Sequence, residues 1–390
     1  MKTIYRLSEL LTADKEFAVG GTWEGGPGDV KVPSKKLGFE FRRLKRGQSN
    51  GVEQVTLQCG AKSVVILPTR GMGIWQATSN DVRFGWDSPV AGPVHPMWVP
   101  VNEPSGIGWL DGFDEMMVRC GLASNGAPEF DEAGRLAFPL HGRIANLPAC
   151  NVEVELDEEA GTIVVRGTVQ ENRFHFQRLE LQTEISMTVE SNEISIVDRV
   201  TNLSDRPANF QMLYHNNFGS PVLEKGSSFL APIKKLVPRD EHAASGMESW
   251  NKFGGPDSCY AEQVYFMELG SDESGYATAA LLNADRSRGV SICYDTAALP
   301  CFSLWKNTVG VADGYVAGLE PATNFPNPRS FEESNGRVVG LSPGASHEIK
   351  FAIGMLTKND DVAQAVAKIE ALSVDQPEVH QHPLGEWCSV

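Results

Sequence analysis

The sequence predicts an all-β protein, built as a large antiparallel β-sandwich with a few short helices. Apolar and polar residues alternate over many short runs, which is the period of a half-buried strand. The 38 glycines and 23 prolines among 390 residues divide these runs, as frequent turns require. Helical spacing is rare, and the sequence shows neither a linker nor a charge block that would separate domains.

We therefore expect one continuous sandwich with short additions at its ends. Residues 1–40 are assigned to an N-terminal extension that packs on the sandwich, 41–358 to the sandwich, and 359–390 to a short helix and C-terminal tail. The first residues lack the apolar core of a secretion signal. No run approaches the roughly 18 apolar residues of a membrane span.

Short strands are predicted wherever β-branched and other apolar residues cluster between turn residues. In chain order these runs cover 64–67, 152–156, 162–169, 290–294 and 349–355.

The clearest alternation lies between residues 179 and 218. Three runs, 179–189, 194–200 and 210–214, are separated by turn residues and predict a three-stranded antiparallel meander. His215 is expected at the end of the third strand. Since successive side chains alternate across a strand, it should face away from the core side chains that precede it.

Two helices are predicted. One covers residues 110–122, where apolar residues recur at helical spacing although Gly112 weakens the pattern. The other follows Asn359, with acidic residues in its first turn and an apolar face that contains Val362 and Ile369.

The charge balance argues against some classes of partner. There are 50 acidic and 34 basic residues, which gives a net charge of −16, whereas nucleic acids and anionic membranes attract basic surfaces. The seven cysteines are odd in number and form no CxxC pair. They indicate reduced thiols and a cytoplasmic location. Exposed sheet edges in a fold of this kind leave either a monomer or a homodimer open.

Residues 66–142 combine aromatic and polar side chains. The tryptophans Trp75, Trp86, Trp98 and Trp109 fall within this quarter of the chain. Aromatic faces beside hydrogen-bonding groups suit sugar rings, whose C–H faces are apolar. The alternative is that these tryptophans fill a β core, and the pattern alone leaves both readings open.

Three short segments carry residues that could do chemistry. His141 is followed by Gly and then Arg143, and in extended chain positions i and i+2 share a face, so both side chains could converge on one ligand. His215 and Asn217 form a second such pair. Glu320 precedes a proline, which holds it in extended geometry.

Taken together, these segments resemble the aldose 1-epimerase, or galactose mutarotase-like, superfamily. Leu-His141-Gly is similar to the first histidine motif of that superfamily, and Tyr-His215-Asn-Asn-Phe-Gly to its second. Gly-Leu-Glu320-Pro is similar to its glutamate segment, and the order His, His, Glu is the same.

The resemblance is greatest to a divergent branch described as a domain of unknown function. That branch carries the Pro-Thr-Arg-Gly-Met run found at 68–72 and the His-Gly-Arg-Ile-x-Asn-x-Pro-Ala run found at 141–149. The resemblance covers about residues 40–355. It departs from ordinary mutarotases in the Arg that follows His141-Gly and in the two Asn that follow His215.

The resemblance implies a sandwich with its active site in a groove on one sheet, and an enzyme that interconverts the anomers of a sugar. Glu320 would be the base, His215 the acid, and His141 a hydrogen-bond donor near the ring oxygen. No cofactor and no metal would be needed. The implied substrate-binding residues are Arg70, Arg143, Asn217, Trp86 and Trp109.

Other functions of such a protein remain open at this stage. The same residues could catalyse another reaction on a sugar or sugar acid, such as lactone hydrolysis or keto-sugar isomerisation. His141, His215 and Glu320 could also hold a divalent metal. A third reading is a carbohydrate-binding protein without turnover. In each case the expected ligand is a small carbohydrate, either an aldose or a sugar acid. If Arg70 or Arg143 lies beside Glu320, we expect an ionised Glu320 paired with a protonated His215.

Overall fold

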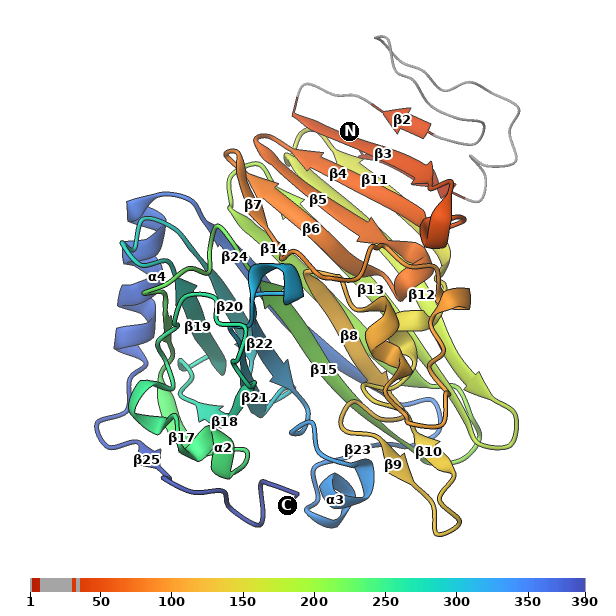
Figure 1. Ribbon diagram of the computed structural model, residues 1–390. Coiled ribbons are helices and arrows are strands. Elements are labelled where there is room, and N and C mark those ends of the chain that lie inside the picture. The colour runs from red at the N-terminus through yellow and green to blue at the C-terminus, as the bar shows by residue number, and fades with distance from the viewer. Residues whose placement is uncertain (1, 8–29, 33–35, 390) are drawn as a thin grey trace.

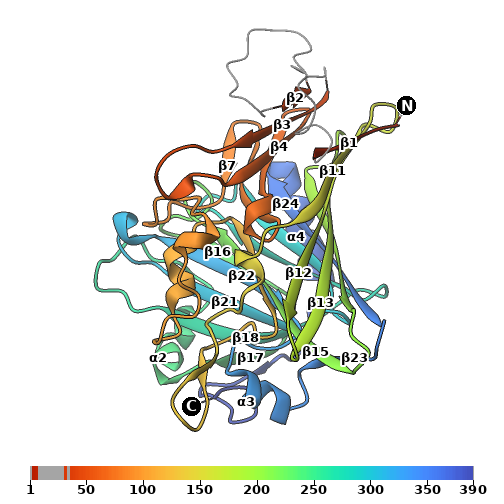
Figure 2. The same ribbon diagram turned by 90° about the vertical axis from the view of Figure 1, so that its right-hand side faces the viewer.

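Two large antiparallel sheets are stacked face to face, as Figure 1 and Figure 2 show. The computed structural model describes residues 2–7, 30–32 and 36–389. Within these residues one sheet has nine strands and the other fourteen, and a two-stranded ribbon stands apart from both. The predicted antiparallel β-sandwich is confirmed.

The nine-stranded sheet combines an N-terminal edge strand with strands from the middle and end of the chain. Its spatial order is β1 (Lys2–Arg6), β11 (Cys150–Asp157), β12 (Thr162–Arg173), β13 (Gln177–Thr188), β14 (Glu193–Asn202), β24 (Ser346–Leu356), β20 (Gly289–Asp295), β19 (Tyr276–Leu282) and β16 (Ser228–Leu230).

The fourteen-stranded sheet carries the residues of interest for function. Its main path is β2 (Val30–Val32), β3 (Leu37–Arg43), β4 (Glu53–Cys59), β5 (Lys62–Leu67), β6 (Gly73–Ser79), β8 (Met117–Leu122), β15 (Ala208–Phe218), β22 (Val316–Ala322), β21 (Cys301–Asn307), β18 (Gln263–Leu269), β17 (Ile233–Pro238) and β25 (Glu378–Val379). β7 (Val82–Phe84) pairs with β6 and β23 (Val339–Leu341) with β15, while β9 (Glu129–Phe130) and β10 (Leu136–Phe138) make the separate ribbon.

The predicted meander is half correct. β13 and β14 form an antiparallel hairpin as expected, and the five shorter predicted strands correspond to β5, β11, β12, β20 and β24. The third strand, β15, instead crosses to the other sheet and lies between β8 and β22, while β24 takes its place beside β14. Alternation shows which face of a strand is apolar but not which strand it pairs with.

One of the two predicted helices is wrong. The region 110–122 contains a short 3₁₀ turn, Gly108–Gly112, followed by the strand β8. β8 is buried on both faces, so its apolar residues do not alternate with exposed polar ones and their spacing fits a helix as well as a strand. The other helix is confirmed as α4 (Asn359–Ala371), whose Val362 and Ile369 pack on the nine-stranded sheet near β19 and β24.

The remaining helical elements are single turns in the loops. They are α2 (Glu241–Ala244), α3 (Arg329–Ser334) and the 3₁₀ turns Gly47–Ser49, Pro68–Arg70, Pro96–Trp98, Ile144–Asn146, Met247–Ser249 and Val311–Asp313. Among the described helices, none is long and apolar enough to cross a membrane.

The main core lies between the sheets and takes side chains from the inner faces of both, for example Ile66 and Tyr214 from one and Leu181 and Ile196 from the other. A second apolar cluster lies on the outer face of the fourteen-stranded sheet, where Trp109 and other loop side chains cover β8, β15 and β22. Polar side chains on this outer face are therefore shielded from solvent by the loops that cover it.

The two chain ends are integrated into the sheets. Of the first 40 residues, the described ones contribute β1 to one sheet and β2 with the start of β3 to the other. The C-terminal tail adds β25 beside β17 and buries Trp387 against Phe325.

Candidate active site

The covered outer face brings His215 and Glu320 together. Both lie near the middle of the fourteen-stranded sheet, His215 on β15 and Glu320 on the adjacent antiparallel β22. Because side chains alternate across β15, Tyr214 enters the main core while His215 and Asn217 face the loops, as the sequence predicts. The Nε2 atom of His215 lies 3.2 Å from Oε1 of Glu320, and both side chains are almost fully buried. We call these two residues the dyad.

An aromatic shell surrounds the dyad. The imidazole centroid of His215 lies 5.0 Å from the Phe113 ring and 5.2 Å from the Trp305 ring, both in edge-to-face geometry. His141 stands 5.5 Å from His215, and Trp109 packs 4.6 Å from His141. Of these side chains, only His141 and Trp305 keep a minor exposed part, so they mark the side of the site that faces solvent.

Gly318 makes room for the carboxyl group. It lies two residues before Glu320 on the same face of β22, opposite Trp305 on β21. A Cβ at this position would lie 2.6 Å from Glu320 Oε1 and 3.1 Å from the Trp305 side chain. A glycine is therefore needed where the carboxyl group and the indole approach the same point.

Asn217 fixes the tautomer of His215. Its amide nitrogen donates to the backbone oxygens of Glu115, at 2.9 Å, and of His215. The amide oxygen is thereby directed to Nδ1 of His215, 2.6 Å away, so that Nδ1 must carry the hydrogen. In the neutral ring Nε2 then has a free lone pair that faces Glu320.

His141 is oriented by a sharp turn. His141 and Gly142 both have positive φ, 56° and 72°, and Nδ1 of His141 donates to the backbone oxygen of Asn125 at 2.9 Å. Its Nε2 is therefore the acceptor in the neutral ring. Because the chain turns here, His141 and Arg143 do not share a face as predicted for an extended chain. The Arg143 side chain points away from His141 and donates to Asn102 at 3.0 Å.

Burial controls the protonation of Glu320. Removal from water raises the pKa of its carboxyl group to about 8, and the negative charge of Glu262 acts in the same direction while Arg239 opposes it. Arg70 pairs with Glu115 rather than with Glu320. At neutral pH the carboxyl group is mostly protonated, which differs from the ionised base expected from the sequence.

Burial has the opposite effect on the two imidazoles. It lowers the pKa of His215 well below its usual value, with a further contribution from His141, and it lowers the pKa of His141 to about 4. Both rings are therefore neutral at pH 7. Where the two side chains of the dyad face each other, Glu320 carries a proton and His215 Nε2 carries a lone pair, which agrees with the tautomer that Asn217 imposes.

Arg70 lies outside the dyad and holds the residues that position it. Its side chain is fully buried, and it binds the Glu115 carboxylate at 2.8 Å, the carbonyl of Gly112 at 2.6 Å and the side-chain oxygen of Asn146. The backbone oxygen of Glu115 in turn holds Asn217. Arg70 thus reaches His215 through two intermediates and lies apart from any substrate surface.

The two sequence runs that carry the family resemblance contact each other. Ala149 donates to the backbone oxygen of Pro68 at 2.8 Å, and Gly71 to that of Leu147 at 3.0 Å. A Cβ on Gly71 would lie 2.3 Å from the backbone oxygen of Ile144, so this approach depends on glycine. The runs 68–72 and 141–149 therefore form one support for the dyad.

The four tryptophans have different surroundings. Trp109 belongs to the shell, and Trp86 lies behind it, in contact with Phe113 and donating to the backbone oxygen of Glu115. Trp75 donates to Asp114, and Trp98 is 52% exposed.

Sequence reasoning did not identify Phe113, Trp305 or Glu262 as parts of the site. Trp305 lies on β21 opposite Gly318 of the next strand, β22, and no motif marks it in the sequence. Glu262 comes just before β18, which pairs with β21 on its other side, and it accepts a hydrogen bond from Trp305 Nε1 at 2.7 Å. In the described part of the chain, no three His, Cys, Asp or Glu side chains are grouped as a metal site would need.

Comparison with known proteins finds one matching family and one similar solved structure over nearly the whole chain. The sequence model of DUF4432, a domain of unknown function, matches residues 49–355. The solved structure of a Klebsiella pneumoniae protein, named "putative aldose 1-epimerase", superposes with a TM-score of 0.90 and is 34% identical, over 99% of this chain and 100% of that chain. No curated protein matches the chain.

More distant solved structures share the fold. A galactose mutarotase-like protein from Clostridium acetobutylicum superposes with a TM-score of 0.59 and 14% identity, over 83% of this chain and 99% of that one. A galactose 1-epimerase from Lactobacillus acidophilus superposes with a TM-score of 0.56 and 13% identity, over 82% and 99%. The chain belongs to the DUF4432 family and shares the fold of galactose mutarotase-like proteins.

Proposed function

We propose that the protein is an aldose 1-epimerase-like enzyme that interconverts sugar anomers, with Glu320 and His215 as its acid–base pair. The observation that carries this proposal is the 3.2 Å contact between His215 Nε2 and Glu320 Oε1. In a cyclic aldose the O1 hydroxyl and the ring oxygen O5 are bonded to the same carbon. An acid and a base that serve them must therefore be neighbours, as these two groups are.

The protonation of the dyad suits a cofactor-free proton exchange. His215 Nε2 accepts the O1 proton while Glu320 protonates O5, so the C1–O5 bond breaks and the C1–O1 bond becomes a carbonyl. Rotation about C1–C2 turns the other face of the carbonyl toward O5. Glu320 then removes the O5 proton as O5 attacks C1, and His215 returns a proton to O1. These resting roles are the reverse of those implied by the family resemblance.

The surrounding side chains have supporting roles in this proposal. We expect the sugar to approach past the partly exposed Trp305 and His141, with aromatic rings of the shell against its C–H faces. His141 Nε2, which is an acceptor in the neutral ring, would receive a hydrogen bond from a sugar hydroxyl. The substrate class we propose is an aldose or a sugar acid.

The test is anomer exchange measured by NMR or polarimetry on a panel of aldoses and uronic acids. We expect at least one sugar whose mutarotation the protein accelerates, and a loss of about 10²- to 10⁴-fold in that rate for His215→Asn. Saturable binding without acceleration of any sugar would instead indicate a carbohydrate-binding protein. Faster hydrolysis of a sugar lactone than exchange of any anomer would assign a different reaction to the dyad.

A further inference from the structure

A cavity separate from the dyad is lined by four arginines. Its volume is about 680 Å³, within the range of small-molecule sites. Arg135, Arg143, Arg173 and Arg329 all line it, whereas Asp131 is the one carboxylate among its described lining residues. On a chain with a net charge of −16, such a local excess of positive charge is unusual and attracts anions.

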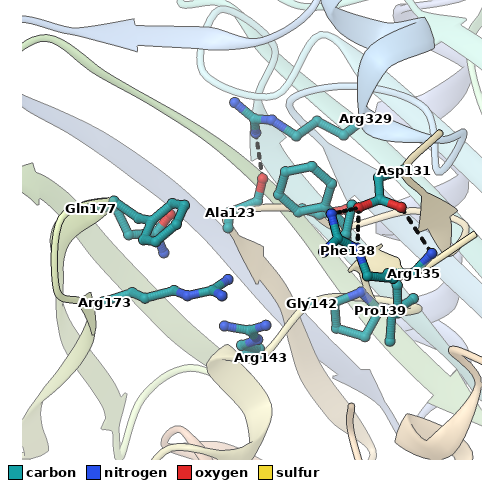
Figure 3. A pocket seen from close by; sticks show the side chains of 14 residues that line it. Ala123, Asp131, Arg135, Phe138, Pro139, Gly142, Arg143, Arg173, Gln177 and Arg329 are labelled. Carbon is teal, nitrogen blue, oxygen red and sulfur yellow. Dashed lines mark hydrogen bonds and ion pairs between the residues drawn. The ribbon is translucent and has the colours of Figure 1, made fainter. Parts of the chain in front are cut away.

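Two of these arginines have no carboxylate partner among the described residues. Arg135 is neutralised by Asp131 at 2.8 Å, and Arg329 donates to the backbone oxygen of Ala123. Arg143 and Arg173 form no such ion pair, and Figure 3 shows their guanidinium groups pointing toward each other across the cavity. An anion placed between the two guanidinium groups would attract both of them and would offset their mutual repulsion.

The nearest buried acid does not supply that anion. Glu171 accepts from the backbone nitrogens of Leu122 and Ala123, at 2.9 and 3.1 Å, and from the Gln177 amide at 2.6 Å. It is thereby engaged in holding the wall of the cavity. In the same wall, Ser124 is fully buried and its hydroxyl has no hydrogen-bond partner. Arg143 Nε is also buried and unpartnered.

Aromatic rings complete the lining. The guanidinium carbon of Arg173 lies 4.4 Å from the centroid of the Phe176 ring, and that of Arg329 lies 5.5 Å from the centroid of the Phe138 ring. Phe176 is 69% exposed at the tip of the β12–β13 hairpin. An exposed phenyl face beside charged donors is suited to a ligand with an apolar ring face and an anionic group.

We propose that this cavity binds a small sugar-like molecule through an anionic group, a carboxylate or a phosphate, held between Arg143 and Arg173. The cavity shares a wall with the candidate active site. Residues 123–125 and 141–143 place Arg143 on the cavity side and His141 on the dyad side. The proposal concerns binding at the arginines and holds whether or not the dyad turns a sugar over.

Isothermal titration calorimetry on the full chain carrying Glu320→Gln would test binding without turnover. The probes are glucuronate, glucose 6-phosphate, inorganic phosphate and glucose. We expect the two anionic sugars to bind more tightly than glucose, and this difference to shrink as salt is added. Arg143→Gln and Arg173→Gln should each weaken that binding by about tenfold or more, since hydrogen bonds to charged groups are the strong ones.

The control is Arg199→Gln, which removes one positive charge from an exposed side chain on β14, in the same sheet as Arg173. It should leave the affinity within about twofold, because its charge is screened from the cavity by solvent. Absence of binding by both anionic sugars, or equal weakening by Arg199→Gln, overturns the proposal. Equally tight binding of inorganic phosphate overturns its sugar component and leaves a site for the anion alone.

Discussion

Two neighbouring residues of strand β15 belong to two different buried polar clusters, one on each face of the sheet. Tyr214 faces the core, where it donates to Asp198 at 2.8 Å. Asp198 also binds Arg119 through both of its oxygens, and Arg119 donates further to Thr183 at 2.7 Å and to the backbone oxygen of Met72 at 2.8 Å. One residue on, His215 faces the other way and meets Glu320, whose Oε1 has no other polar partner among the described residues.

The difference shows that burial alone does not decide whether a group is charged. Burial opposes the charge on Arg119, but Asp198 outweighs it and the pKa of Arg119 lies above its usual value. Glu320 is buried as deeply without a comparable counter-charge, and its pKa rises to about 8. The first cluster holds its charges permanently and ties the two sheets together, whereas the second holds a proton that can move.

Asp198→Asn should break the core cluster with the largest effect on stability. It leaves the Arg119 charge buried without its counter-charge, so we expect a loss of about 3–5 kcal/mol in the free energy of unfolding, measured by urea denaturation. Glu348→Gln, which removes the exposed partner of Arg199, should cost less than about 1 kcal/mol. A similar cost for both variants would contradict the distinction between the buried and the exposed pair.

Glu320→Gln should instead have a large effect on activity and little effect on stability. It keeps the shape of the side chain and removes its transferable proton, so we expect the anomer-exchange rate to fall by about 10²- to 10⁴-fold while stability is kept or slightly raised. Glu268→Gln, an exposed change on β18 of the same sheet, serves as the control and should retain activity. Near-normal exchange in Glu320→Gln would remove the carboxyl group from the mechanism.

The pH dependence of the free energy of unfolding should reveal the contribution of Glu320 in the second cluster. The pKa of Glu320 is about 8 when folded and about 4.5 when unfolded, so the folded state binds more protons between these values and stability falls as pH rises. The histidines act in the opposite sense, but only below about pH 6.5, where the unfolded imidazoles titrate.

Between pH 6.5 and 8 the contribution of Glu320 is therefore unopposed by the histidines. We expect wild type to lose roughly 1.4 kcal/mol per pH unit relative to Glu320→Gln at the acid end of this range and about half as much per unit near pH 8, measured by denaturation at several pH values. Parallel pH profiles for wild type and variant would mean that the carboxyl group is already ionised at pH 6.5.

Gly318→Ala should have the smallest effect of the four. The new Cβ would lie 2.6 Å from Glu320 Oε1, so the carboxyl group must shift relative to His215. We expect the exchange rate to fall by about tenfold, since small displacements of a catalytic group are costly. Gly340→Ala on β23 is the matched control, because the nearest atom to its Cβ would be 3.7 Å away. Equal rates for both variants would show that the space beside Glu320 is not limiting.

The local pattern of the sequence is sufficient to predict the strands and the faces on which their side chains lie. Alternation alone places Tyr214 in the core and His215 on the other face, and it predicts the β13–β14 hairpin correctly. The pairing of β15 with β8 and β22 could not be predicted, because strand partners far apart in sequence are chosen by the packing of the whole sheet.

Within the site, the misplaced residues have specific causes. Arg143 diverges from His141 because both His141 and Gly142 adopt positive φ, which an extended-chain argument does not allow for. Arg70 is engaged by Glu115, a residue with no motif to mark it. The protonation of Glu320 depends on how completely loops cover the outer face, and burial of that kind is a tertiary property.

The interlocked runs 68–72 and 141–149 have a consequence for tracing relatives of this chain by sequence. Several of their residues make backbone contacts between the two runs, such as the approach of Gly71 to Ile144, rather than contacts with the dyad. A search pattern built on these runs will therefore collect proteins that share the supporting framework whatever molecule they act on. Within such a collection, variation at the position of Arg173, which lies in neither run, would show which members keep the proposed anion site.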